Sequence, residues 1–188
     1  HNLIDIIIQK DKELLVFLNN LGTEQWDPFW LAITNQLHWA PLFIFVFFLV
    51  IKSKGWKRGG FIIFCMILLD AFSDQFVNLI KDSTERLRPN NDIAIQSLLR
   101  TFIRPQSFSF LSGHATTSTF FTVFTILLLK DHFKYMYLMC VFPLLFSYSS
   151  LYLGVPFPLD ISLGILTGIV LGRLYFLLYR KVDQKLFD

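Results

Sequence analysis

The sequence predicts an all-α fold, a polytopic bundle of helices embedded in a membrane. Hydrophobic residues make up 54% of the 188 positions, 22 positions are phenylalanine, and the mean hydropathy is +0.52, which is too apolar for a soluble domain of this size. Apolar runs of helical length recur along the chain, with basic residues gathered between them. We expect about five transmembrane helices and N-terminal interfacial helices in a single membrane domain, residues 1–188.

The first 37 residues (1–37) predict helices that lie at the membrane surface. Residues 3–19 carry leucine and isoleucine at near-helical spacing among charges, which is typical of an amphipathic interfacial helix. Three tryptophans between residues 26 and 39 resemble the aromatic belt at a bilayer edge, so a second interfacial helix is expected from Asp27 to Leu37. Residues 1–12 mix isoleucine with charges rather than forming a cleavable signal peptide, so we expect insertion through the internal helices.

Five apolar runs predict the transmembrane core, residues 39–180. A hydrocarbon core of about 30 Å takes roughly 20 helical residues, so the short first and third runs need protein cover or longer helices than their apolar stretch suggests. Cys65 and Cys140 lie inside these runs and are expected to be buried apolar residues. The predicted spans are Trp39–Ile51, Gly60–Ile80, Ala115–Leu129, Tyr135–Leu153 and Leu159–Tyr179.

Charge orients the predicted bundle. Basic residues concentrate in residues 52–58, 130–134 and 180–185, which the positive-inside rule places in the cytoplasm. The long loop 81–112 and the short loop 154–158 then face the opposite side, the periplasm of a bacterial-type inner membrane. The net charge of +3 is small, and the basic residues are segregated between the apolar runs rather than clustered into one patch, so no nucleic-acid partner is expected.

The long outer loop opens with a basic motif, a lysine followed after six residues by Arg-Pro. On a helix, seven positions turn through about 700°, so Lys81 and Arg88 would share one face about two turns apart, with Pro89 ending the helix. Arginine offers a forked donor and lysine a point charge, and both suit phosphate oxygens. The alternative is a basic segment attracted to anionic headgroups without a specific site.

A second motif, Ser112-Gly113-His114, opens the third span. A serine N-cap followed by glycine offers backbone N–H groups and the positive end of a helix to an anion. Alone this tripeptide more often marks a helix start. Soon after the basic motif it predicts a phosphate cradle.

These two motifs and a third, further along the chain, resemble the signatures of the type 2 phosphatidic acid phosphatases, a superfamily that includes the vanadium haloperoxidases. The family's third signature has the form Ser-Arg-x5-His-x3-Asp. Here Ser149 and Asp160 remain, whereas Ser150 replaces the arginine and Pro156 replaces the histidine. In the second signature, Leu111 replaces a proline. The resemblance is nevertheless extensive, since it covers residues from about 26 to 180.

The resemblance implies roles for the matching positions. It assigns His114 as the general acid that protonates the leaving oxygen. It implies no metal and no cofactor. In the family the missing histidine attacks phosphorus and the aspartate orients it, so Asp160 would be an orienter with nothing to orient; alternatively, it is a favourable anion in the first turn of a helix. The phosphate-binding residues that it implies are Lys81, Arg88, Ser112, Gly113 and His114.

Proline cannot act as a nucleophile and serine cannot replace a guanidinium. We therefore expect a pseudophosphatase, which binds a membrane lipid that carries a phosphate or diphosphate but does not cleave it. One alternative is an active lipid phosphatase, of the undecaprenyl diphosphate or phosphatidic acid type for example. Another is a structural subunit that docks a membrane-protein partner, or a homo-oligomer.

Other polar residues in or near the apolar runs have weaker interpretations. Asp70, Asp74 and Asn78 recur every four residues toward the basic motif, and we expect them to face the bundle interior in a structural hydrogen-bond network rather than a proton path. Arg173 is expected either to pair with one of them or to extend its charged end to a membrane interface. His38 is expected to be structural. In the outer loop, Arg100 and Arg104 are candidates to replace the lost guanidinium.

Overall fold

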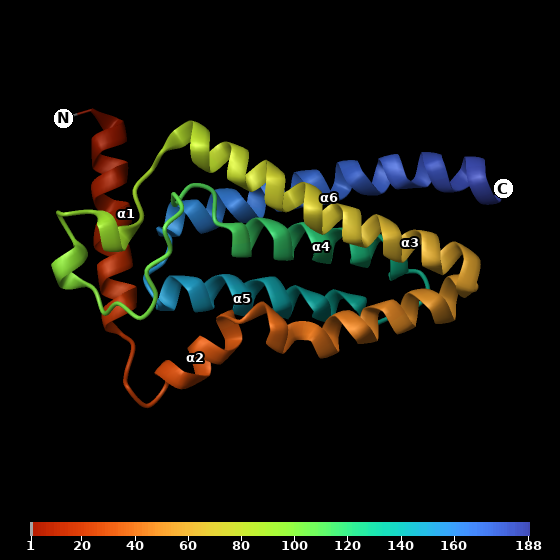
Figure 1. Ribbon diagram of the computed structural model, residues 1–188, viewed down its shortest axis with the longest axis horizontal. Coiled ribbons are helices and arrows are strands. Elements are labelled where there is room, and N and C mark those ends of the chain that lie inside the picture. Colours follow the sequence, from red (N-terminus) through yellow and green to blue (C-terminus); the bar gives the residue numbers. More distant parts are fainter. Residues whose placement is uncertain (1) are drawn as a thin grey trace.

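The computed structural model describes residues 2–188, so His1, in the predicted interfacial segment, lies outside it. All regular secondary structure in the described residues is helical, without strands (Figure 1). Its α-helices are α1 (Leu3–Asn20), α2 (Asp27–Thr34), α3 (Ala40–Thr84), α4 (Gly113–Leu129), α5 (Val141–Tyr152) and α6 (Pro158–Phe187). Short 3-10 turns are η1 (Gln36–Trp39), η2 (Pro89–Asn91), η3 (Gln96–Leu98) and η4 (Met136–Cys140).

Helix α3 is folded into two arms at Gly55, where the chain turns back along the bundle (Figure 1). Gly55 has φ of 80°, a conformation that glycine adopts without steric cost. The arms contain the first two predicted spans, and with α4, α5 and α6 they give the predicted five. The expected loop 52–58 is instead helical on both sides of the kink. Of the described segments, residues 36–91 and α6 are long and apolar enough to cross a membrane, while α4 and residues 136–152 are shorter apolar helices.

Glycines bring α6 close to α4 at the centre of the bundle. Gly164, Gly168 and Gly172 recur every four residues and face α4. A Cβ added to Gly168 would lie 2.7 Å from the carbonyl oxygen of Thr116. Small residues at this spacing let membrane helices approach closely and pack by van der Waals contact. The stripe therefore fixes α6, and the loop before it, relative to the start of α4.

Phenylalanines fill the core, and Phe120 and Phe124 are fully buried on α4. Large apolar side chains on the outer faces of α3 and α6 remain exposed, as expected of helices that face lipid. Cys65 is buried as predicted, but Cys140 is exposed, so the expectation for it is wrong. Cys140 ends the 3-10 turn before α5, and there its side chain points out of the bundle.

The predicted amphipathic helix is α1, which crosses the end of the bundle nearly perpendicular to the other helices (Figure 1). Its buried stripe is Asp11, Leu15 and Asn19, one residue per turn. Asn19 donates from Nδ2 to the carbonyl oxygens of Arg100 and Tyr152, at 3.1 and 3.2 Å. The second interfacial helix is shorter than predicted, because α2 ends at Thr34 and a 3-10 turn follows.

Candidate functional site

A cavity of about 440 Å³ lies between α4 and the second arm of α3, and it brings part of the predicted site together. Lys81, Gly113 and His114 all line it. Lys81 comes from the last turn of α3, whereas Gly113 and His114 open α4. Two segments more than 30 residues apart thus meet at one end of the bundle, as the two motifs predicted.

Lys81 is a buried cation without a partner. It is 9% exposed, and its ammonium group makes no hydrogen bond or ion pair within residues 2–188. Its Nζ lies 3.9 Å from where a Cβ of Gly113 would be, at the start of α4. A buried charge is costly unless it is paired, so this arrangement favours an anion between Lys81 and the amide end of α4.

His114 is held in place by two other helices. Its Nε2 lies 3.2 Å from both the hydroxyl and the carbonyl oxygen of Thr34, at the end of α2. Its ring packs on Phe146 of α5, with 4.2 Å between ring centroids. The imidazole therefore has a fixed orientation in the cavity wall, beside Lys81.

The structure places Arg88 differently from the prediction. Helix α3 ends at Thr84, and Glu85 adopts a left-handed conformation with φ of 49°, so the predicted helical face through Lys81 and Arg88 does not exist. Arg88 lies in the loop, buried at 8% exposure, and does not line the cavity. Its guanidinium donates to the Ser107 carbonyl at 2.7 Å, to the Ser107 hydroxyl at 2.8 Å and to the Val155 carbonyl at 3.3 Å. Arg88 thus joins the long outer loop to the loop of the third motif.

Ser112 acts as the predicted N-cap of α4. Its Oγ accepts from the backbone N–H of Ala115 at 3.3 Å, and its own N–H donates to the Asp160 carbonyl at 3.2 Å. Like Arg88, Ser112 lies outside the cavity wall. Arg88 therefore joins the two outer loops, whereas Ser112 joins the start of α4 to the first turn of α6.

The third motif offers no nucleophile. Ser149 and Ser150 each donate their hydroxyl to a carbonyl one turn earlier in α5, at 2.6 and 2.7 Å. Pro156 is buried in the loop between α5 and α6. None of the three lines the cavity. The positions of the family's arginine and histidine thus contribute to packing only.

Asp160 is fully buried and well bonded, which corresponds to its alternative role at the start of a helix. Its carboxylate accepts from the Phe157 N–H at 2.9 Å, capping α6, and from the Ser109 hydroxyl. It also accepts from Arg86 Nη1 at 2.6 Å. Arg86 continues to Asp11 of α1 at 2.7 Å.

Sequence reasoning missed Arg86, although it lies inside the first motif. Its guanidinium sits 4.2 Å from the centroid of the Phe157 ring, next to the third motif. A buried carboxylate at Asp160 requires a cationic partner, and this requirement could have indicated a nearby arginine such as Arg86. The predicted substitute Arg100 is instead engaged with Asp27 of α2, at 2.5 Å. Arg104 is exposed and forms no ion pair in the described chain.

The polar stripe lines the cavity as predicted, but the predicted network is wrong. Asp70, Asp74 and Asn78 all face the cavity, and none of their side chains makes a hydrogen bond or ion pair within residues 2–188. Arg173 does not pair with them either. His38 is structural as expected, with Nδ1 2.7 Å from the Ala32 carbonyl.

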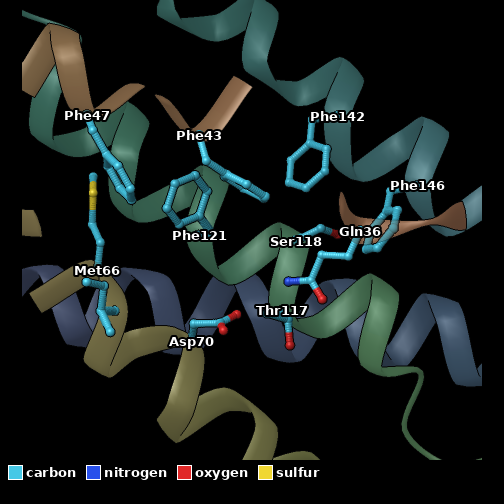
Figure 2. Close-up of a pocket in the computed structure, with 11 residues that line it drawn as sticks. Gln36, Phe43, Phe47, Met66, Asp70, Thr117, Ser118, Phe121, Phe142 and Phe146 are labelled. Carbon is cyan, nitrogen blue, oxygen red and sulfur yellow. The ribbon is translucent and has the colours of Figure 1, made fainter. Parts of the chain in front are cut away.

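An apolar cavity of about 180 Å³ adjoins the polar one. Figure 2 shows phenylalanine rings from both sides of it, among them Phe43, Phe121 and Phe142, above the carboxylate of Asp70. The two cavities share Asp70 and, from other elements, Gln36, Thr117 and Phe146. A charged compartment therefore opens into an aromatic one inside the bundle.

The protein is an apolar helical bundle in which Lys81 lies beside Gly113, where a Ser-Gly-His motif begins α4. This combination defines a membrane protein of the lipid phosphatase type. Comparison with known protein families identifies the superfamily. The model of the PAP2 superfamily matches residues 58–184, and the chain belongs to that superfamily.

Relatives in the superfamily are bacterial membrane phosphatases. A lipid A 4'-phosphatase of Bacteroides thetaiotaomicron is 28% identical to this chain, in a match that covers 98% of this chain and 83% of the relative's length. A lipid A 4'-phosphatase of Porphyromonas gingivalis is also 28% identical, and that match covers 94% of this chain and 75% of the relative's length. The phosphatidylglycerophosphatase B of Bacillus subtilis is 31% identical over 64% of this chain and 58% of its own.

Solved structures confirm the fold. The transmembrane PAP2 type phosphatidylglycerolphosphate phosphatase of Bacillus subtilis matches with a TM-score of 0.70 at 21% identity, over 100% of this chain and 91% of that one. LpxE of Aquifex aeolicus matches with a TM-score of 0.65 at 22% identity, over 87% and 92%. The predicted fold, an all-α membrane helix bundle of this superfamily, is thus confirmed.

Proposed function

We propose that this protein binds the phosphate or diphosphate headgroup of a membrane lipid and does not hydrolyse it. The observation that carries this proposal is Lys81, a buried cation without a partner beside the amide end of α4. Phosphate supplies the missing anion and accepts hydrogen bonds from both groups. His114 lines the same wall of the cavity, and its protonated ring would add a donor to the phosphate.

The absence of turnover follows from the third motif. Covalent phosphoryl transfer needs a nucleophile, and the hydrocarbon side chain of Pro156 has no lone pair to serve as one. Ser150 is uncharged, so it supplies no positive charge for the transition state, and its hydroxyl donates back into α5. Asp160 would have no imidazole to orient, and its carboxylate binds Arg86 and Ser109 instead.

An active phosphatase is the second candidate, because His114 remains beside Lys81 in the cavity. In that case water attacks phosphorus directly and His114 protonates the leaving oxygen. The relatives named as lipid A 4'-phosphatases and phosphatidylglycerophosphatase B indicate which lipids to test first. The apolar cavity would hold part of an acyl chain. The membrane is proposed to be the bacterial inner membrane, with the cavity opening toward the periplasm.

Two measurements on purified protein separate the candidates. Binding of lipid phosphates should fall at least about tenfold in Lys81→Met, the loss of one charge-assisted hydrogen bond. Lys57→Met, an exposed change just after the Gly55 kink and outside the cavity, is the matched control and should bind normally. Unchanged binding in Lys81→Met would overturn the proposed site.

Phosphate release from the same lipids tests the chemistry. We expect none from the natural sequence. Steady release that disappears in His114→Ala would establish the second candidate and end the first. The double variant Ser150→Arg with Pro156→His should gain release, since it restores the two missing groups of the family signature.

A further inference from the structure

Two carboxylates in the cavity have no place in the function proposed so far. Asp74 and Asp70 lie one turn apart on α3 and face the cavity without any partner in the described chain. Both side chains are exposed in the open cavity, whereas the buried aspartates of the described chain are all paired: Asp11 and Asp160 bind Arg86, Asp27 binds Arg100, and Asp183 binds Arg58. Unpaired carboxylates on a membrane helix are costly, so an interaction that the protein alone does not provide is expected at this position.

Lys81 adds the second, independent observation. It is nine-tenths buried, has no partner and lines the same cavity as the two carboxylates. Asp74 lies seven residues before Lys81, about 10 Å along the helix axis, and side chains on a helix lean toward its N-terminus, so Lys81 leans toward Asp74. Nevertheless no ion pair joins them. The cavity thus separates one cation from two anions instead of letting them neutralise each other.

This separation determines which ligand fits. A purely anionic headgroup at Lys81 would be repelled by Asp74, because like charges would face each other across the same cavity. A headgroup that also carries a positive charge satisfies both ends. We propose that the cavity takes a phosphate headgroup bearing an ammonium group, with the phosphate at Lys81 and Gly113 and the ammonium at Asp74. This inference rests on the proposed function, because the phosphate half of the ligand is the one proposed above.

Asp70 extends the same chemistry one turn deeper. It borders the aromatic cavity as well as the polar one, and Figure 2 shows its carboxylate beneath the phenylalanine rings. An ammonium bound at Asp74 would therefore lie near a second carboxylate. Two carboxylates are a stronger attraction for one cation than a single one, and they explain why both are present on this face of the helix.

The decisive experiment changes the ligand rather than the protein. Binding of short-chain phosphatidylethanolamine to the full chain in nonionic detergent is compared with binding of its N-acetylated form, which keeps the phosphate and loses the ammonium charge. We expect the amine form to bind at least about tenfold more tightly, the value of one charge-assisted hydrogen bond. Equal affinity of the two lipids would overturn the inference. The comparison uses the unchanged protein, so misfolding of a variant cannot affect the result.

Variants then locate the ammonium. Asp74→Asn should remove the preference and leave binding of the N-acetylated lipid unchanged or tighter. The matched control is Asp82→Asn, the same change at an exposed position of α3 outside the cavity, which should keep the preference. A preference that persists in Asp74→Asn, or that is lost equally in Asp82→Asn, would contradict the assignment.

The two proposals fail differently in this experiment. If both lipids bind equally and both require Lys81, the phosphate site stands and the ammonium site falls. If neither lipid shows binding that depends on Lys81, the proposed function falls together with the inference.

Discussion

Replacing Arg86 with methionine should destabilise the protein, because it removes the cation from two buried carboxylates at once. Arg86 bridges Asp11 of α1 and Asp160 of α6, and the side chains of these two aspartates are 2% and 0% exposed. Methionine keeps most of the volume over the Phe157 ring but no charge. The carboxylates would then be left without compensation in a nearly dry environment.

The expected loss follows from that burial. Breaking a buried ion pair by removing one partner costs about 3–5 kcal/mol, because the remaining charge stays buried without a compensating partner. The Arg86 side chain is 24% exposed, so solvent screens part of the interaction and we expect about 3 kcal/mol, the lower end of that range. The double variant Arg86→Met with Asp160→Asn should be more stable than Arg86→Met alone, because one stranded charge has gone.

The assay is denaturant unfolding of the purified protein in detergent, followed by helix content. Arg104→Met is the matched control, an exposed arginine of the same loop without an ion pair in the described chain, and it should change stability by less than about 0.5 kcal/mol. A loss below about 1 kcal/mol for Arg86→Met, or a double variant no more stable than the single one, would refute the reasoning.

Two further changes test the packing and the charges around the site. Gly168→Ala should cost about 1–3 kcal/mol, because the new methyl group would lie 2.7 Å from the Thr116 carbonyl oxygen; Gly60→Ala, with open space at its Cβ, is the control, and equal stability of the two variants would contradict the packing argument. Partial burial raises the pKa of the Asp92 carboxyl, but hydrogen bonds from Lys12 and a backbone N–H outweigh it and hold the pKa below its ordinary value of 3.8. A lowered pKa stabilises the fold above that value, so stability should fall as the pH drops through the Asp92 pKa, and Asp92→Asn should flatten this fall in unfolding measured from pH 6 to pH 3. A pH dependence identical in Asp92→Asn and the unchanged protein would rule out this contribution.

The helices could be predicted from the sequence because each is a local pattern. The apolar runs gave the spans, and Ser112 followed by Gly113 gave the start of α4. The kink of α3 was predicted as a loop, since lysines and glycines are typical of one and nothing local distinguishes a loop from a single residue with positive φ at Gly55. The glycine stripe of α6 is also local, and its spacing could have predicted the contact with α4.

The pairings within the site could not be predicted in the same way. Arg86 binds carboxylates 75 positions before it and 74 positions after it, and no short pattern contains such a pair. The helical spacing assigned to Lys81 and Arg88 failed because Glu85 ends the helix between them in a left-handed turn. The absence of a partner for Asp74 is likewise a property of the folded chain, since any of 17 basic residues in the sequence was available to pair with it.

The family match begins at residue 58, yet several contacts of the site come from before that boundary. Thr34 holds the imidazole of His114, and Asp11 shares Arg86 with Asp160. The first arm of α3 supplies Phe43 and Phe47 to the aromatic cavity. A shortened protein cut at the boundary would therefore retain every signature position while losing contacts that give those positions their geometry, and it should not be used as a minimal version of the domain.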